Sequence, residues 1–156
     1  MAGTPATAAL TAAGIPFTEH AYVHDPAIRD FGAEAAAALG VDPDQVFKTL
    51  LAEVDGRLVV GIVPVTGKLD LKALAASVGG KRATMADPAL AERRTGYVVG
   101  GISPIGQKTR HVTVLDETAE LWDLVYVSGG RRGLDLSLAP ADLIRATDAV
   151  LADIAR

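Results

Sequence analysis

Two adjacent β-rich runs separated by an Asp-Gly dipeptide constrain the fold of this chain more than any other feature. Residues 46–54 and 57–65 are rich in Val, Leu and Ile, and Asp55-Gly56 lies between them. Asp-Gly is favoured in the two-residue turn of a β-hairpin, because that turn needs positive φ angles that Gly and Asp tolerate. The sequence therefore predicts an antiparallel hairpin, which we place at the centre of the sheet.

Capping residues predict short helices around this hairpin, with Thr or Asp before most first turns and Gly after most last turns. The expected helices cover residues 5–13, 32–39, 70–78, 87–95 and 140–154, the last with a break near Thr147-Asp148, and Asp42-Pro43 starts a short helical turn. Further strands are expected at residues 16–23, 112–115, 124–128 and 134–138. Helices and strands mix without strict alternation, so we expect an α+β fold and not a doubly wound parallel sheet.

Length and composition favour one compact domain over residues 1–156. The chain is 49% hydrophobic but only 4% aromatic, so its core must be packed from Ala, Val, Leu and Ile. It has no apolar run of about 18 residues and no basic region typical of a secretory signal, so we expect no membrane contact and a cytoplasmic location. The absence of cysteine excludes disulfides, thiolate metal sites and a cysteine nucleophile.

The charges are distributed unevenly along the chain. The net charge of −4 argues against a protein that binds nucleic acid through its overall charge alone. Residues 81–132, however, carry eight basic and six acidic groups, and the basic residues include the pairs Lys81-Arg82, Arg93-Arg94 and Arg131-Arg132. A local patch that faces phosphates and a solvated surface of mixed charge both remain open.

The strand pattern indicates that Lys48 is a candidate functional residue. Period-two alternation puts Lys48 on the same face as Val46 and Leu50. A lysine on a buried strand face is costly unless it lines a cleft, where its charge holds an anion or polarises a carbonyl. The alternative is an edge-strand lysine that discourages aggregation, and the pattern alone leaves both open.

Two glycine-rich segments, residues 100–106 and 128–133, are candidates for backbone contacts with a ligand. Glycine permits positive φ and lacks a β-carbon, so backbone N–H groups can approach a ligand closely. Neither segment matches a nucleotide-binding fingerprint, so each is a weak signal by itself, and ordinary tight turns explain both.

The histidines and serines give no convincing catalytic or metal-binding set. His24 and Asp25 are adjacent and would point to opposite faces of a strand, while Pro26 interrupts any strand that would align His20 with His24. Ser103 and Ser128 lack an obvious general base. Tyr22 and Asp135 are polar residues at predicted strands, either lining a site or satisfied within the structure.

Six collinear segments carry a resemblance to a known family. Its most specific parts are Val-Phe-Lys-Thr-Leu at 46–50 and Gly-Gly-Ile-Ser-Pro at 100–104. The full set comprises residues 24–26, 42–50, 69–72, 85–88, 95–108 and 127–135. From about Thr4 to the C-terminus the chain resembles the YbaK family of Cys-tRNA(Pro) deacylases, which are relatives of the editing domain inserted in bacterial prolyl-tRNA synthetases.

The resemblance implies a mixed, largely antiparallel, β-barrel-like sheet surrounded by helices, with the site in a cleft beside the Lys48 strand. It implies that Lys48 is the essential cationic residue. The residues that it assigns to the substrate pocket are Tyr22, Phe31, Thr49, Gly100, Gly101, Ser128, Gly129 and Asp135. Where relatives often have an uncharged polar residue before this phenylalanine, the chain has Asp30.

The resemblance also implies an activity. It predicts a trans-editing enzyme that clears Cys-tRNA(Pro), with Cys-tRNA(Cys) as a further candidate substrate, through attack of the substrate's own thiol on the aminoacyl ester, without a metal or cofactor. The expected partners are the 3′ end of aminoacyl-tRNA and, as a further hypothesis, prolyl-tRNA synthetase. Two alternatives remain: water-mediated hydrolysis of Ala-tRNA(Pro) or another small-amino-acid tRNA, and a tRNA-binding module without catalysis.

Overall fold

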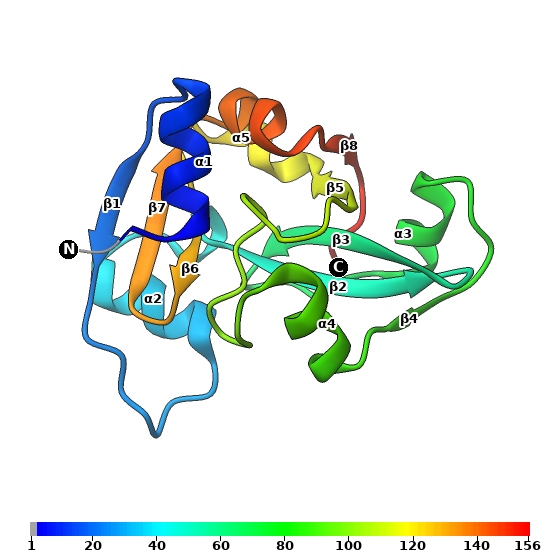
Figure 1. Ribbon diagram of the computed structural model, residues 1–156, viewed down its shortest axis with the longest axis horizontal. Coiled ribbons are helices and arrows are strands. Elements are labelled where there is room, and N and C mark those ends of the chain that lie inside the picture. The colour runs from blue at the N-terminus through cyan, green and yellow to red at the C-terminus, as the bar shows by residue number, and fades with distance from the viewer. Residues whose placement is uncertain (1–2) are drawn as a thin grey trace.

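The computed structural model, which describes residues 3–156, contains two β-sheets flanked by short helices (Figure 1). A five-stranded sheet has the order β4-β2-β3-β5-β8, and a three-stranded sheet has the order β1-β7-β6. The strands are β1 (Thr18–Ala21), β2 (Phe47–Val54), β3 (Arg57–Pro64), β4 (Ala83–Met85), β5 (Val112–Asp116), β6 (Val125–Arg131), β7 (Leu134–Leu138) and β8 (Val150–Ala152). The α+β class is therefore confirmed.

The predicted hairpin is confirmed and organises the larger sheet. All eight residues of β2 pair with β3, from Phe47 opposite Pro64 to Val54 opposite Arg57. Asp55 and Gly56 both have positive φ, 49° and 85°, as a two-residue hairpin turn requires. β3 is the middle strand of the five, so the hairpin lies at the centre of the sheet.

Four of the α-helices match their sequence signals closely. These are α1 (Pro5–Ala13), α2 (Phe31–Leu39), α3 (Leu71–Ser77) and α4 (Pro88–Thr95). Each has an N-cap side chain that accepts a backbone N–H: Thr4, Asp30, Asp70 and Asp87. Local capping chemistry therefore sets the starts of these helices. The 3-10 turns η1 (Pro43–Gln45) and η2 (Glu117–Leu121) complete this set of short elements.

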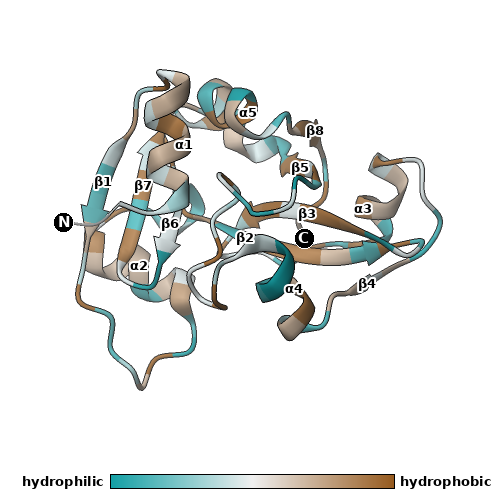
Figure 2. Cartoon of the chain, viewed as in Figure 1, coloured by the Kyte–Doolittle hydropathy of each residue, from teal (hydrophilic) through white to brown (hydrophobic). Residues whose placement is uncertain are grey.

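The core divides into two hydrophobic clusters, and β2, β3 and β5 contribute residues to both of them. In the first, Ala6 and Leu10 of α1 pack with Val127 and Leu136 of the three-stranded sheet. In the second, Leu74 of α3 packs on residues of β2, β3 and β5. Figure 2 shows the corresponding hydrophobic stretch along β3 and a hydrophilic stretch on α4. Within residues 3–156, no helix has the length and apolar character needed to span a membrane.

The expected barrel-like closure is replaced by two open sheets. Within residues 3–156, the backbone pairing between the two sheets is an isolated parallel bridge between Val46 and Tyr126. Val46 directly follows the 3-10 turn η1, whose Pro43 has no N–H, so the bridge cannot extend into a ladder on the N-terminal side. The bridge precedes β2, and within residues 3–156 no ladder joins β2 itself to β6.

The predicted C-terminal helix is wrong beyond residue 147. Helix α5 (Pro140–Thr147) ends at Asp148, whose φ of 54° lies in the left-handed region, and β8 follows. β8 runs parallel to β5, with Val150 opposite Val114. The buried Asp116 side chain accepts the N–H groups of Ile154 and Ala155, each at 2.9 Å. Pairing with a distant strand and a buried carboxylate thus override the helical pattern at this end.

Candidate functional site

A cleft of about 360 Å³ lies between α2, β2, α4 and the ends of the three-stranded sheet. Seven of the nine site residues expected from the sequence line this cleft: Tyr22, Phe31, Lys48, Thr49, Gly100, Ser128 and Asp135. They come from six separate stretches of the chain, which the fold brings to one place. Their roles in substrate binding and catalysis stay predictions.

The wall of the cleft that carries Lys48 is the part of β2 with no second strand beside it. β2 pairs with β3 along its whole length, but its ladder with β4 covers only Ala52–Val54. Lys48 therefore lies on an open stretch of the strand and at the same time lines the cleft. Among residues 3–156 no carboxylate forms an ion pair with its ammonium group. The free charge is available to an anionic ligand.

Thr49 adds a polar atom that has no partner within the protein. Its Oγ1 is buried and makes no hydrogen bond to any of residues 3–156. Buried polar atoms are nearly always hydrogen-bonded in native proteins, to protein or to water. The hydroxyl of Thr49 therefore offers an unused hydrogen-bonding group in the wall of the cleft.

The polar side of the three-stranded sheet supplies Asp135, Ser128 and Tyr22. Asp135 on β7 stands opposite Ser128 on β6 and opposite His20 on β1. Asp135 is only 6% exposed, and this burial raises the pKa of its carboxyl to about 7. Burial and, next, the nearby Asp135 charge raise the pKa of Tyr22 to about 12. Tyr22 therefore stays protonated near neutral pH while Asp135 titrates there.

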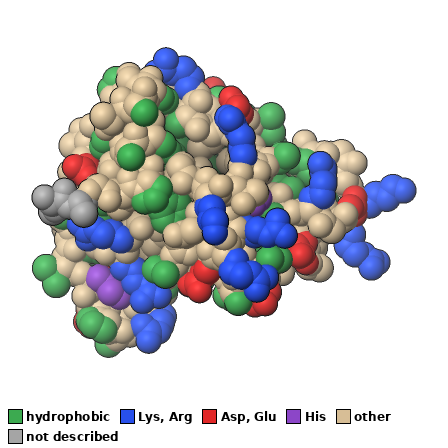
Figure 3. All heavy atoms as spheres, in the orientation of Figure 1, with side chains coloured by type: hydrophobic (Ala, Val, Ile, Leu, Met, Phe, Trp, Pro, Cys, Tyr) green, Lys and Arg blue, Asp and Glu red, His purple; other side chains and the backbone are tan. Residues whose placement is uncertain are grey.

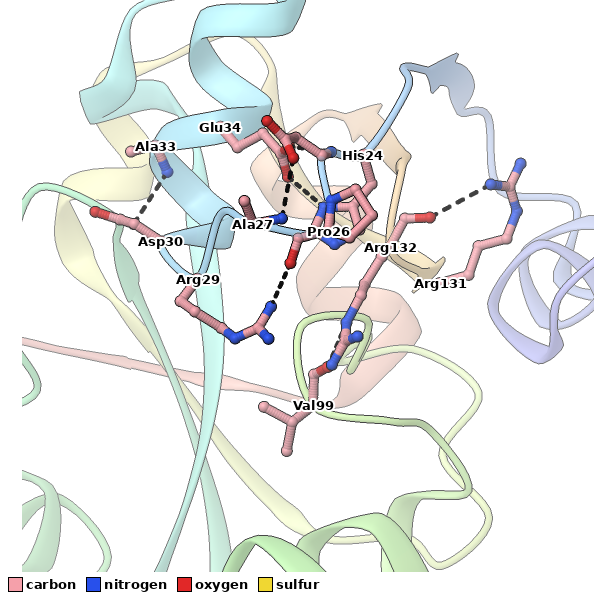
Figure 4. Close-up of polar contacts among 11 residues, drawn as sticks. His24, Pro26, Ala27, Arg29, Asp30, Ala33, Glu34, Val99, Arg131 and Arg132 are labelled. Carbon is pink, nitrogen blue, oxygen red and sulfur yellow. Dashed lines mark hydrogen bonds and ion pairs between the residues drawn. The ribbon is translucent and has the colours of Figure 1, made fainter.

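The rim of the cleft is built from Phe31, Gly100 and Arg132. The Arg132 guanidinium lies 4.9 Å from the centroid of the Phe31 ring. Its Nε and Nη2 also donate hydrogen bonds to the Val99 carbonyl, at 2.9 and 2.6 Å (Figure 4). Gly100 continues this rim with a φ of 88°. One arginine thus fastens the turn between β6 and β7 to the glycine loop and to the start of α2.

The two remaining site residues expected from the sequence, Gly101 and Gly129, do not line the cleft. A Cβ on Gly101 would lie 2.8 Å from the Arg131 Cα, and one on Gly129 would lie 2.6 Å from the Leu134 Cγ. Gly101 therefore permits close approach of the Arg131 backbone, and Gly129 permits close approach of Leu134.

Several cleft residues were not anticipated from the sequence. Arg29 and Asp30 lie at the entrance to α2, and Pro88 and Ala91 come from α4. Asp30 also accepts the Ala33 N–H at 3.3 Å, so the departure from the family pattern before Phe31 serves as a helix cap. That cap was detectable from the Asp before a helix. Arg29, in an irregular loop, carried no such signal.

His24 takes a structural position in this fold. His24 does not orient toward Asp25; its Nδ1 lies 2.6 Å from the Glu34 Oε1, while the Asp25 N–H donates to Glu34 Oε2 at 2.7 Å. These contacts anchor the loop before α2 (Figure 4). Both contacts lower the pKa of the Glu34 carboxyl, and the hydrogen bond from the Asp25 N–H has the larger effect. Within residues 3–156, no cluster of three His, Asp or Glu side chains is arranged to hold a metal ion.

Comparison with known proteins extends the likeness over most of the chain. The family model of the aminoacyl-tRNA editing domain matches residues 25–146. EbsC of Enterococcus faecalis, described as a candidate Cys-tRNA(Pro)/Cys-tRNA(Cys) deacylase, is 35% identical over 143 residues, 90% of this chain and 85% of that protein. The proline–tRNA ligase of Maridesulfovibrio salexigens is 32% identical over 100 residues, 64% of this chain and 17% of the ligase.

Solved structures agree with the sequence relatives. A candidate trans-editing enzyme for prolyl tRNA synthetase superposes with a TM-score of 0.83 at 27% identity, covering 97% of this chain and 95% of that one. A hypothetical protein superposes with a TM-score of 0.87 at 28% identity, covering 97% and 99% of the two chains. The family resemblance of the sequence is thereby confirmed, and the chain belongs to the aminoacyl-tRNA editing domain family.

Proposed function

We propose that this protein is a trans-acting deacylase that clears Cys-tRNA(Pro), with Cys-tRNA(Cys) as a second substrate. The observation that carries the proposal is the content of the cleft. It contains the free ammonium of Lys48 and the buried Asp135, but neither His nor Cys is among its lining residues. A Ser–His or Cys–His pair is therefore missing from the cleft, which favours a reaction in which the substrate supplies the nucleophile. The likeness to EbsC supports the substrate class.

The need for such an enzyme follows from the size of the two amino acids. Cysteine and proline side chains are close in volume, so a pocket for proline gains only a small discrimination against cysteine. Hydrolytic or cyclising removal of the wrong product restores accuracy. A cleft that uses the substrate's own thiol would release cysteine from the tRNA. Amino acids that lack a thiol would remain attached to the tRNA.

In the proposed reaction the cysteine sulfur attacks the carbonyl carbon of its own ester. The carbon–sulfur bond forms, the bond from that carbon to the ribose oxygen breaks, and a cyclic thiolactone leaves. The proton lost by the thiol is balanced by the proton that the ribose oxygen gains. Asp135 lies in the cleft with a pKa of about 7, close enough to that of a thiol for it to take up and return this proton.

Lys48 and the loop N–H groups would position the substrate for this attack. The ammonium group suits the terminal phosphate or the oxygen that becomes negative as sulfur adds to the carbonyl. Holding the thiol near the carbonyl also removes much of the entropic barrier, an effect that supplies several kcal/mol in favourable cases. Lys48 and Thr49, neighbours on the open stretch of β2, carry the free polar groups suited to this task.

We further propose that prolyl-tRNA synthetase supplies part of the tRNA binding, in the cytoplasm where translation takes place. The net charge of −4 predicts a modest affinity of the isolated protein for tRNA. Related domains are built into proline–tRNA ligases, which supports a shared site of action. Tight binding of tRNA by the purified protein at physiological salt, without the synthetase, would contradict this proposal.

One assay tests substrate and mechanism together. Purified protein is incubated separately with Cys-tRNA(Pro), Ala-tRNA(Pro) and Ser-tRNA(Pro), and the released product is identified by mass spectrometry. Release of the thiolactone from Cys-tRNA(Pro), with little release of serine or alanine, is the expected result. Equal rates for cysteine and serine would favour an attacking water molecule, and binding without release of any amino acid would leave only a tRNA-binding role.

A further inference from the structure

A basic patch, defined by Arg93, Arg94 and Lys108, lies outside the cleft and has no role in the proposed reaction. Between Arg93 and Leu115 the chain has four basic residues and no acidic one, although the protein as a whole is acidic. Figure 3 shows Lys and Arg side chains spread across the face of the molecule on which α4 lies. The local charge therefore differs in sign from the net charge.

The fold brings the members of this patch together from two segments. The Lys108 N–H donates to the Thr95 carbonyl at 2.8 Å, and the Thr109 N–H donates to the Arg94 carbonyl at 3.0 Å. These bonds hold Lys108 beside the last turn of α4, and all three side chains of the patch are exposed. The arrangement is fixed by the backbone and does not depend on the cations themselves.

The charges of the patch are not neutralised within the described part of the chain. Arg110, the next cation along, is paired with Asp148, whereas no carboxylate forms an ion pair with Arg93, Arg94 or Lys108. The nearest acidic residue in sequence, Glu92, accepts the Val99 N–H at 2.8 Å. Its carboxylate reduces the positive charge of the region. The same hydrogen bond holds the loop that carries Gly100.

The patch is connected to the cleft through shared elements. α4 contributes Pro88 and Ala91 to the cleft lining, and its last turn carries Arg93 and Arg94. The loop that follows contributes Val99 and Gly100 to the rim. A strand of nucleic acid that ends in the cleft can therefore continue across the outer side of the same helix and loop.

We infer that the basic patch binds phosphates of the acceptor strand of tRNA, next to the 3′ end that enters the cleft. The inference rests on the proposed function and adds to it the surface that holds the body of the substrate. Exposed, unpaired cations on a rigid backbone suit phosphate groups, and they contribute to binding without reading the base sequence. Arg93 and Arg94 also suit the C-terminal end of a helix dipole, so the test must separate this effect from phosphate binding.

The test measures binding of fluorescein-labelled, deacylated tRNA(Pro) by anisotropy at several KCl concentrations. The triple variant R93Q/R94Q/K108Q is compared with R57Q/K68Q/K72Q, which removes the same charge from exposed positions at the start of β3 and around α3. Neutralising three phosphate contacts should reduce the slope of log K against log salt concentration by about 2 to 3. The control triple variant should retain the wild-type slope.

Two further arms keep the result interpretable. The variant R93K/R94K preserves charge and should bind tRNA like the wild type, whereas a role confined to helix stability would show as a lowered melting temperature of the glutamine variant. Equal loss of binding in both triple variants, or no loss in either, would overturn the inference. So would a patch-dependent preference for vesicles of anionic lipid over tRNA.

Deacylation of Cys-tRNA(Pro) by the wild-type protein is followed in parallel. If the wild-type protein releases product while the patch variant binds tRNA as tightly as the wild type, the inference about the basic patch is wrong and the proposed function stands. If tRNA binding depends on the patch but no amino acid is released, the inference about the basic patch stands and the proposed function is wrong. The two failures are therefore distinguishable.

Discussion

Gly100 and Phe31 are in such close contact that a Cβ on Gly100 would lie 2.8 Å from the Phe31 Cζ. The same Cβ would lie 2.8 Å from the Arg132 Nε, and the φ of Gly100 is 88°. Any side chain here meets both a backbone penalty and a steric one. The rim of the cleft therefore requires glycine at this position for two independent reasons.

Gly100→Ala should destabilise the protein and disturb the cleft. The left-handed backbone alone costs about 1 kcal/mol, and displacement of Phe31 and Arg132 adds to it, for a total of about 2–3 kcal/mol. Gly79→Ala is the matched control, because Gly79 has a φ of 72° but no heavy atom within 4 Å of a Cβ. Thermal unfolding should rank Gly100→Ala below Gly79→Ala, and only the former should lose deacylase activity. Equal melting temperatures would contradict the contact.

Lys48→Ala should abolish deacylation while the fold stays intact. The side chain has no ion-pair partner within residues 3–156, so its loss leaves no carboxylate unpaired. Removing one group that stabilises developing charge lowers kcat by roughly 100-fold or more. Lys72→Ala, at an exposed position on α3, should keep wild-type activity. Near-full activity of Lys48→Ala at an unchanged melting temperature would remove Lys48 from the mechanism.

Asp135→Asn should make the protein more stable at high pH and have little effect at low pH. The folded-state pKa of about 7 lies above the ordinary carboxyl value of 3.8, so the folded protein holds this proton more tightly than the unfolded chain. Stability is therefore full below about pH 4 and falls as the pH rises through 7. About three pKa units set an upper limit of about 4 kcal/mol on this loss.

Thermal unfolding of wild type and Asp135→Asn at pH 4, 6 and 8 measures this difference. The two melting temperatures should be closest at pH 4 and should separate toward pH 8, with the asparagine variant higher. A separation that grows toward low pH would show that the carboxylate is stabilised in the folded state, contrary to the burial of Asp135.

Thr49→Val should separate stability from activity. The hydroxyl is buried without a partner in residues 3–156, so valine, which has nearly the same shape, should leave stability unchanged or raise it by about 1 kcal/mol. If the hydroxyl binds the substrate, kcat/KM should fall by about tenfold. Loss of stability without loss of activity would assign the hydroxyl to the fold.

Local signals predicted the parts of this fold that depend on neighbouring residues. The hairpin follows from Asp55-Gly56, and helix starts follow from side chains such as Asp70 and Asp87. β4 and β8 were missed because three residues form a strand only when a distant partner, β2 or β5, offers unpaired backbone groups. Nothing within residues 150–152 distinguishes this outcome from a helix.

In the candidate site, too, local sequence indicated some residues, while others could be recognised only from contacts in the fold. Lys48 was visible as a charge in an apolar strand, and Asp135 as a carboxylate between two leucines. Whether a glycine faces a ligand or a neighbouring backbone depends on packing between segments, and so Gly101 and Gly129 could not be told from Gly100. Arg132 was visible only as a charge, because its contact with Phe31 joins residues about a hundred positions apart.

The open stretch of β2 has a consequence for how the cleft changes during evolution. In an antiparallel pair, every second residue directs its N–H and C=O away from its partner strand. At Leu51 that carbonyl accepts the Ala86 N–H, and two residues earlier, at Thr49, no strand of residues 3–156 occupies this side. Part of the cleft's polarity therefore belongs to the main chain, where substitutions of side chains cannot remove it. Such a surface tolerates variation in the residues around it while it continues to offer the same donor and acceptor.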